Sequence, residues 1–557
     1  MELAKLSLVL LSIALCAVAQ AQSQNVFEEP QQAWTVFHHP IRRVAVVGAG
    51  PSGLQAAAKL IEHNFTVRLF EAAEHPGGIW HYSEETPLRE AYPDKPIEHA
   101  ADIPIKIPAT RYYCEGDNGL TLDDRWRQHW RPRPMWDNLH ANSPKASTEL
   151  PDVQYDRDAP WVLSQHAIQR HVRSYASHHC LNSNDRCPAA GPPVVSYSTR
   201  VEKVEKDTKE HKWILTLRRL ERLRESNRIL EEWWTETFDA VVLATGPYVS
   251  AHVPDIEGIV DWSKAKEGER YSMCHSQSYR HPERYENKTI LLVGASISAS
   301  EIARDIGPFV HRLLASVRDT PNRPGVRQRS LTRFPAITEF IPEIASFEPL
   351  QKHGDGIRKG KIHLVNGSVM QGVDEIILAT GFQGYSLYPP NTSGLPLLHF
   401  LRSNPCRTTW RPQNLYFTGH WIPDSTIAYT NRRPWTLGRY QSYAFAKVWE
   451  GSARLPSPEQ IEKQEHGSAS RSYWLDMWLA EAVFRRFVSW LNDASLEHGG
   501  RFVQPPPIEN LELFRYYTVV HLNNTVRLED LDMPSLLSKQ SATEDAWNEM
   551  VYEDADW

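Results

Sequence analysis

Three glycines and a glutamate near the N-terminus have the spacing of a dinucleotide-binding site. Gly48, Gly50 and Gly53 form the pattern G-x-G-x-x-G directly after the apolar run VAVV. In this pattern the first glycine permits a tight turn, the second lets the backbone approach a pyrophosphate, and the third allows a helix to pack closely on a strand. Glu71 lies 23 residues after Gly48, where a carboxylate accepts hydrogen bonds from a ribose 2′-hydroxyl. These residues predict a bound dinucleotide; the alternative is a glycine-rich turn in a plain α/β domain.

The residues around these glycines would complete the site. Pro51 and Ser52 begin a predicted helix, which would direct its N-terminal amides at the phosphate. Further on, the sequence HPGGIW contains Gly78 and Trp80. A glycine lets the backbone pass close to a ligand, and a tryptophan offers a flat apolar face. We interpret this stretch as a loop on the flavin side of the site, with a simple turn over a core tryptophan as the alternative.

A second stretch, TILLVGASISASEIARDI, has the same design with fewer glycines. Its apolar run ends at Gly294, and Ser296 and Ala299 replace the second and third glycines, with Ser298 between them. The next apolar run is followed by Arg318, 24 residues after Gly294. Since an arginine here suits a ribose 2′-phosphate, these five residues predict a second site, which binds NADPH. The alternative is a βαβ unit whose arginine is incidental.

Both motifs need parallel strands followed by helices, and two further strands indicate how the units are connected. The sequences FDAVVLATGPY (238–248) and VDEIILATGFQ (373–383) bracket the second motif, and each leads an apolar strand into Ala-Thr-Gly. This order indicates a chain that leaves one domain, forms another and returns, with Gly246 and Gly381 at the crossovers. The predicted fold is therefore α/β with two Rossmann-like dinucleotide-binding domains, the second inserted into the first.

Composition and charge exclude some classes of protein. The chain has 557 residues, of which 41% are hydrophobic and 23% charged, as in a globular protein of two or three domains. The net charge of −7 argues against a general nucleic-acid binder. No run after the N-terminal one is apolar enough to span a membrane, and no metal site is predicted.

The N-terminus has the form of a secretory signal peptide. A short apolar run from Leu6 to Ala19 follows Lys5, and small residues come after it. We therefore expect a signal peptide at 1–21 and a protein of the secretory pathway, secreted or lumenal; an uncleaved anchor is the alternative. Cys180 and Cys187 bracket a polar loop and could form a disulfide. The N-x-S/T sequons predict a glycoprotein; they lie at Asn64, Asn287, Asn366, Asn391 and Asn523.

From about residue 42 to about residue 450 the sequence resembles the flavin-containing monooxygenases. In its second fingerprint, GASISA, it resembles the fungal members more than the animal ones. The likeness rests on GAGPSGL, Glu71, GGIW, the two ATG crossovers and the order of the two motifs. The segment MWDNLHANSPK resembles the family segment that carries an asparagine beside the flavin, here Asn142. The family's linker pattern, F-x-G-x-x-x-H-x-x-x-Y, is matched through His275 and Tyr279, but its phenylalanine and glycine are absent.

The resemblance implies an enzyme with FAD in the first domain and NADPH in the second. NADPH would reduce FAD, and reduced flavin would react with O2 to give a C4a-hydroperoxyflavin that oxygenates a nitrogen or sulfur of a small molecule. Asn142 is the implied catalytic residue, because its amide can stabilise that intermediate. The implied activity is like that of N,N-dimethylaniline monooxygenase, in a possible homodimer. One alternative is Baeyer–Villiger oxygenation of a ketone, although the linker pattern of the Baeyer–Villiger monooxygenases differs from Tyr279-Arg280 of this chain. The other alternative is a secreted nucleotide-binding protein without turnover.

Five segments summarise the predicted organisation. A signal peptide (1–21) precedes the first part of the FAD domain (41–250), the NADPH domain (251–375) and the return segment of the FAD domain (376–450). A helical extension with an acidic tail (451–557) follows. Its run SYWLDMWLAEAVFRRFVSWLNDAS is predicted to be a packed helix, with a membrane-surface helix as the alternative.

Overall fold

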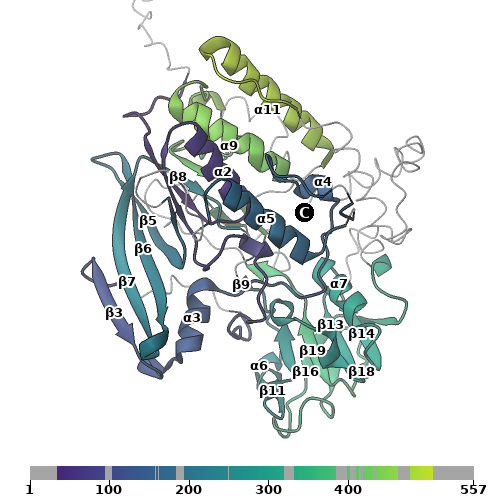
Figure 1. Cartoon of the computed structure of the whole chain (residues 1–557). Helices are drawn as coiled ribbons and strands as arrows, with labels where there is room; N and C mark the ends of the chain where they lie inside the picture. The colour runs from purple at the N-terminus through teal and green to yellow at the C-terminus, as the bar shows by residue number, and fades with distance from the viewer. Residues whose placement is uncertain are drawn as a thin grey trace, which may run out of the picture.

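Two five-stranded parallel sheets form the frame of the molecule in this computed structural model (Figure 1). The structure describes residues 34–94, 103–156, 158–160, 162–182, 194–246, 248, 250–318, 331–383, 398–401, 409–412, 415–416, 418–430, 435–461 and 477–505. The predicted signal peptide, Cys187 and two sequons, Asn391 and Asn523, lie outside the described residues.

The first sheet has the strand order β23-β8-β1-β2-β4, and all its pairs are parallel. The strands at 43–47 and 240–243 read as nearly continuous apolar runs, as expected of strands covered on both faces. The strand bounds are β1 Arg43–Val47, β2 Thr66–Phe70, β4 Val195–Ser196, β8 Ala240–Leu243 and β23 Ile427–Tyr429.

Helices α2 (Pro51–Glu62), α5 (Gln165–His178) and α9 (Trp435–Glu450) contribute to one apolar core with this sheet. The C-terminal helix α11 (Met477–His498) lies along α9 (Figure 1). Phe484 and Phe487 of α11 are buried in the same core, so the described part of this helix is packed, as predicted.

The second sheet has the order β12-β19-β13-β14-β15 and is also parallel. Helix α7 (Ile297–Ile306) connects β13 to β14, which makes the second βαβ unit. The strands are β12 Met273–His275, β13 Thr289–Val293, β14 Arg312–Val317, β15 Thr338–Pro342 and β19 Glu375–Leu378.

The order of the strands confirms that the second unit is inserted into the first. The chain leaves the first sheet after β8, builds the second sheet, and returns to the first with β23. At the crossovers, β9 (Ser250–Ala251) pairs antiparallel with β20 (Phe382–Gln383). The sequence placed the end of the second domain at residue 375, which is the first residue of β19. This strand continues to Leu378, directly before the second Ala-Thr-Gly turn, so the second sheet extends to Leu378.

Antiparallel layers flank the two units. A four-stranded sheet of order β3-β7-β6-β5 packs beside the first unit, and a three-stranded sheet, β16-β17-β18, beside the second. The strands of these layers are β3 Ala109–Tyr113, β5 Thr199–Asp207, β6 Lys212–Leu223, β7 Arg228–Phe238, β16 Ile344–Phe347, β17 Ile362–Leu364 and β18 Val369–Met370. The remaining elements are β10 Lys266–Glu267, β11 Arg270–Tyr271, β21 Leu398–Leu401, β22 Thr409–Pro412, α3 Leu122–Trp130, α4 Lys145–Thr148, α6 Ile259–Trp262, η1 Gly78–Trp80, η2 Asp117–Gly119, η3 Arg224–Ser226, η4 Ser276–Ser278 and η5 Pro282–Tyr285.

Covalent and membrane features complete the description. Cys180 forms a disulfide, whose partner lies outside the described residues. The described sequon residues Asn64, Asn287 and Asn366 are all exposed. Across the described parts of the chain, the helices are too short or too polar to cross a membrane.

Candidate functional site

The fold itself requires two of the glycines of the first motif. Gly48 has φ +104°, and a Cβ there would lie 2.5 Å from the carbonyl oxygen of Ala244. A Cβ on Gly53 would lie 1.9 Å from the carbonyl oxygen of Gly48. Any side chain at either position would therefore collide with backbone, so these glycines allow strand and helix to approach closely.

Gly50 has a different reason to be glycine. It is the N-cap of α2, with φ −76° and ψ 176°, a conformation that any residue adopts. A Cβ there would make only an ordinary contact, at 3.4 Å from the Cα of Gly78. Since packing does not exclude a side chain at Gly50, the bare backbone in front of the α2 amides fits a pyrophosphate.

The GGIW loop rests on this turn. The Gly77 amide donates to the Ala49 carbonyl at 3.0 Å. Gly78 has φ +57°, and a Cβ there would lie 2.7 Å from the Cα of Gly50. Trp80 packs against the first core and meets the ring of Trp435 edge-on at 6.3 Å. The loop therefore packs directly on the first glycine turn, and its contact with a flavin stays a prediction.

Glu71 is buried at the end of β2, and its carboxylate is held by three donors. Its Oε2 accepts the Ala49 amide at 2.8 Å. Its Oε1 accepts the Ala73 amide at 3.0 Å and Nη2 of Arg133 at 3.2 Å. A carboxylate oxygen has two lone pairs, so Oε2 keeps one for a ribose hydroxyl. Sequence reasoning missed Arg133, because no local spacing connects it with Glu71.

The second motif repeats the first turn almost unchanged. Gly294 has φ +118°, and a Cβ there would lie 2.5 Å from the carbonyl oxygen of Ala379. This is the same obstruction that Ala244 presents to Gly48, and both alanines belong to the Ala-Thr-Gly crossovers. The first position of both motifs is therefore glycine because a Cβ there would collide with the carbonyl oxygen of the crossover alanine.

The other two glycines of the second motif are replaced without disrupting the turn. Ser296 is the N-cap of α7, with φ −96° and ψ −167°, and its side chain is exposed. Ser298 is half-buried, and Ala299 is fully buried in the core of the second unit. Ser296 has the extended backbone of Gly50, and the helix accommodates the methyl group of Ala299. The second motif thus keeps the backbone geometry of the first turn, with less space in front of its helix.

The strand register separates the two sites at the ribose position. The Gly48 amide donates to Phe70, the residue before Glu71, whereas the Gly294 amide donates to Ser316. The residue after Ser316 is Val317, so a buried valine stands in the place of the first site's glutamate, and Arg318 is one residue further along.

Arg318 lies at the rim of the second site rather than inside it. Its Nε forms a 3.0 Å ion pair with Glu343, and both side chains are about two-fifths exposed. The second site therefore has no carboxylate at the ribose position of its βαβ unit and has a guanidinium beside it. That chemistry fits a 2′-phosphate better than a 2′-hydroxyl.

Asn142 lies where one chain segment crosses from the second unit to the first. Earlier in this segment, Asn138 donates to Asp305 of α7 at 3.0 Å, and Leu139 packs on the core of the second unit. Ala141 is buried in the core of the first unit. Asn142 follows directly, half-buried, before α4. The junction of two dinucleotide sites is where a hydride donor and acceptor would meet.

The linker histidine is buried against the crossover. The His275 amide donates to Glu90 at 2.9 Å, and its ring meets Phe382 edge-on at 5.4 Å. Burial lowers the pKa of His275 to about 4, so the ring is neutral. The hydroxyl of Tyr279 donates to Asp305 at 2.6 Å. Both residues thus anchor the linker, with Glu269 and Tyr271 in place of the family's phenylalanine and glycine.

Arg280 was not predicted, although it makes many contacts between the units. Its buried guanidinium donates to five backbone carbonyls, which belong to Ser83, Glu85, Arg133, Gln277 and Tyr279. Burial lowers the pKa of this arginine to about 10. It joins the segment after the GGIW loop to the linker and to the loop that carries Arg133.

Gly246 and Gly381 mark the two crossovers as expected. Their φ angles are +71° and +91°, and a Cβ on either would meet nothing within 4 Å. Their left-handed backbone, rather than crowding, selects glycine there.

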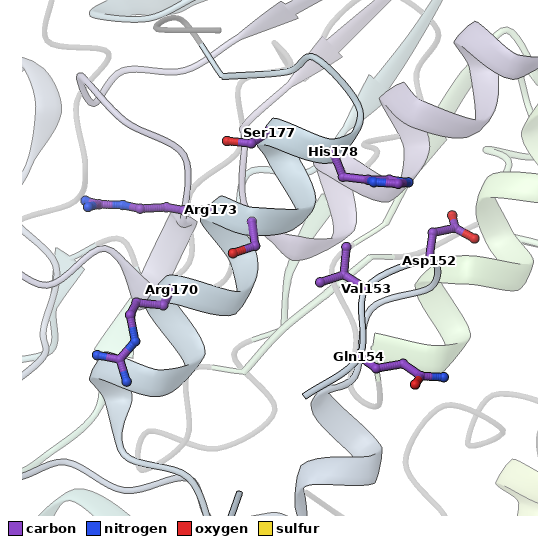
Figure 2. Close-up of a pocket in the computed structure, with 8 residues that line it drawn as sticks. Asp152, Val153, Gln154, Arg170, Arg173, Ser177 and His178 are labelled. Atoms are coloured by element: carbon purple, nitrogen blue, oxygen red, sulfur yellow. The ribbon is translucent and has the colours of Figure 1, made fainter. Parts of the chain in front are cut away.

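A separate pocket lies outside these residues, on the outer face of α5 (Figure 2). It is lined by Asp152, Val153, Gln154, Arg170, Arg173, Ser174, Ser177 and His178, none of which was predicted to bind a cofactor. Arg173 donates to Nδ1 of the buried His81 at 3.2 Å. Within the described residues, no cluster of His, Cys, Asp and Glu could hold a metal ion.

Comparisons with known proteins agree with this architecture. The model of the pyridine nucleotide-disulphide oxidoreductase family matches residues 42–318. Flavin-containing monooxygenase iboF of Amanita muscaria is 31% identical over 545 residues, which cover 89% of this chain and 99% of that protein. Flavin-containing monooxygenase ustF2 of Aspergillus flavus is 28% identical, over 77% of this chain and 86% of that one. The solved structure of S-allyl-L-cysteine S-oxygenase from Allium sativum has the same fold, with TM-score 0.58, 17% identity, and coverage of 91% and 99%.

Proposed function

Since this chain belongs to the flavin-containing monooxygenases, we propose that it uses NADPH and O2 to oxygenate a nitrogen or sulfur atom of a small molecule. The proposal rests on two glycine turns that have the same geometry but different residues at the position where a ribose would bind. One has a buried glutamate, and the other has a valine followed by an arginine. Two dinucleotides of different chemistry can therefore be bound by one chain.

The first site would hold FAD. The turn at Gly50 and the N-terminus of α2 would bind the pyrophosphate, and Glu71 would accept a ribose hydroxyl. The loop at Gly78 and Trp80 would lie along the cofactor. When bound, FAD supplies the redox chemistry and the reaction with O2, so the protein's task is to orient partners and exclude water.

The second site would hold NADPH, with the α7 N-terminus at its pyrophosphate and Arg318 at its 2′-phosphate. The segment ending at Asn142 joins the two units, so its half-buried amide would donate a hydrogen bond where the two cofactors meet. A preorganised amide donor in a dry site stabilises developing charge.

A nitrogen or sulfur nucleophile is preferred over a ketone because the linker continues as Tyr279-Arg280, and Arg280 is committed to backbone carbonyls.

Purified protein tests the proposal directly. We expect flavin absorbance in the isolated protein, faster oxidation of NADPH than of NADH, and oxygenated products from a panel of thioethers and amines. Ketones form the third arm of the panel, and lactone or ester products would instead indicate Baeyer–Villiger chemistry. Protein that binds both cofactors but forms no product from any arm, and no hydrogen peroxide, would be a binding protein without turnover.

A further inference from the structure

Arg280 is a buried cation whose five hydrogen bonds all go to neutral carbonyl oxygens. The residue is only 7% exposed. A guanidinium has five N–H donors, and here each has one acceptor. These acceptors are Ser83 for Nε at 3.0 Å, Gln277 and Tyr279 for Nη1 at 3.0 and 2.8 Å, and Glu85 and Arg133 for Nη2 at 2.6 and 3.2 Å. Burying a charge costs free energy even when it is hydrogen-bonded, so stability alone is a weak explanation for this arginine.

Three of the acceptors belong to segments attached to the first dinucleotide site. The carbonyl of Arg133 accepts Nη2 of Arg280, and the guanidinium of Arg133 donates to Oε1 of Glu71 at 3.2 Å. The other two acceptors on this side, Ser83 and Glu85, follow the GGIW loop closely in the chain. On this side Arg280 is therefore connected to the carboxylate that would accept the FAD ribose.

The remaining acceptors belong to the linker of the second unit. Tyr279 is buried in the core of that unit, and its hydroxyl donates to Asp305 of α7 at 2.6 Å. Helix α7 is the one whose N-terminus would face the NADPH pyrophosphate. The backbone carbonyl of Arg280 also accepts the Asp137 amide at 3.3 Å, on the segment that leads into Asn142. A single guanidinium thus connects the elements that would anchor the two dinucleotides.

We propose that Arg280 is a positioning residue for hydride transfer from NADPH to FAD, an inference that rests on the proposed function above. It holds the first site and the linker of the second unit at one separation, so that the two reacting rings meet. A misplacement of about 1 Å can slow such a reaction about a hundredfold. Lysine has three donors on a flexible stem in place of five in a rigid planar fork, so Arg280→Lys keeps the charge and loses the geometry.

The rate constant for flavin reduction at saturating NADPH, measured without oxygen, is the first test. Arg280→Lys should lower it at least about tenfold. The dissociation constants of FAD and NADP+ should stay within about twofold of wild type, because no residue of either site is changed. A slowing that disappears at saturating NADPH would assign Arg280 to binding and overturn the proposal, as would an unchanged rate constant.

Distances in the apoprotein give a second test that does not depend on turnover. Spin labels on Ser174→Cys of α5 and His311→Cys before β14 occupy exposed positions of the first and second units. The exposed Cys114 is replaced by serine in this background. The distance distribution should be narrow with Arg280 intact and broader or shifted with Arg280→Lys. An unchanged distribution would overturn the proposal even if reduction slowed.

Arg218→Lys is the matched control. The Arg218 side chain is 15% exposed, and its partners Glu202, Glu231 and His129 all lie beside the first unit, on β5, β7 and α3. This variant should lose stability but keep the reduction rate constant and the label distances. Equal slowing in Arg218→Lys would mean that any loss of stability suffices, which would overturn the role of Arg280.

A second variant covers the case in which Arg280→Lys does not fold. Tyr279→Phe removes only the hydroxyl that is bonded to Asp305, loosens the same connection, and is measured in the same two ways. Wild-type reduction and label distances in this variant would overturn the proposal. Wild-type protein that binds FAD but is not reduced by NADPH would instead contradict the proposed function.

Discussion

At the scale of single residues, the two motifs contain two kinds of glycine position: those where a Cβ would collide with the backbone, and one where only a ligand would exclude a side chain. Gly48, Gly53 and Gly294 each face a backbone oxygen that would collide with a Cβ. Gly50 faces no such obstruction, and its counterpart Ser296 shows that a side chain fits the same extended conformation. A substitution at Gly50 should therefore affect the ligand rather than the fold.

We predict that Gly50→Val folds but loses FAD. Valine adopts the observed φ and ψ readily, while its side chain would fill the approach to the α2 amides. The flavin content of purified protein, read from its absorbance, should fall strongly, with an apoprotein melting temperature close to that of wild type. Gly53→Ala is the contrast, because its Cβ would strike Gly48 and destabilise the fold itself. Gly50→Val protein that is folded and equally yellow would refute the assignment.

We predict that Arg318→Ala weakens NADPH binding about tenfold to a hundredfold, the effect of one charge-assisted contact. NADH binding should hardly change, because NADH has no 2′-phosphate. The ion pair with Glu343 is exposed, so stability should change little. Arg312→Ala, which removes an exposed arginine of β14 paired with Glu339, is the control. Equal weakening of both nucleotides would show that Arg318 does not contact the phosphate.

We predict that Asn142→Ala uncouples NADPH oxidation from product formation. Its amide would stabilise oxygen transfer but takes no part in hydride delivery. One preorganised donor contributes about 3 kcal/mol in such sites, so hydrogen peroxide should replace most of the product. Peroxide and product yields per NADPH measure the effect, with the neighbouring Ser143→Ala as control. Unchanged coupling in a mutant with full flavin content would leave Asn142 a turn residue before Pro144.

At the scale of elements, the sequence predicted the units that are local in the chain. Both βαβ units, the crossovers and the buried C-terminal helix follow from apolar runs and glycine spacing. The position of Asn142 beside both units depended on the family resemblance. Arg133 and Arg280 escaped prediction because their partners are distant: Arg133 reaches Glu71 across 62 residues and Arg280 reaches Ser83 across 197. Local periodicity contains no information about such pairs.

The register at the second site shows the same limit on a smaller scale. Counting residues placed Arg318 level with Glu71, but the strand pairing sets Val317 there. A difference of one residue moves a side chain to the other side of a strand. Spacing therefore located the site, and only the hydrogen-bonded register located its side chains.

At the scale of the whole molecule, several features suit folding in the secretory pathway, which we propose as its route. Cys180 is disulfide-bonded, and the sequons at Asn64, Asn287 and Asn366 are exposed. Expressed in a eukaryotic secretory host, the protein should gain mass that an N-glycosidase removes. Replacing each sequon asparagine by glutamine should remove part of it. Protein with unmodified mass at all sequons would contradict the glycosylation and weaken the proposed route.

The buried histidines make the stability of the whole molecule sensitive to acid. His275 and His420 are fully buried, and burial lowers their pKa values to about 4 and about 3. In the unfolded chain a histidine titrates near pH 6.5. Below that pH the unfolded state therefore binds protons that the folded state does not. The free energy of unfolding should fall as the pH falls from about 6.5 toward 4, by up to about 1.4 kcal/mol per pH unit for each histidine.

His420 is the sharper test of this prediction, because its ring is enclosed by Phe445 and Trp449 and bonds only to Thr418 among the described residues. Phenylalanine would preserve the edge-on ring contacts without a titrating group. In urea unfolding between about pH 7 and pH 5, His420→Phe should therefore show a shallower loss of stability with acid than wild type. His311→Gln controls for the removal of an exposed histidine. A His420→Phe slope identical to that of wild type would mean that this histidine binds the same number of protons in the folded and unfolded states over this pH range, and that acid sensitivity arises elsewhere.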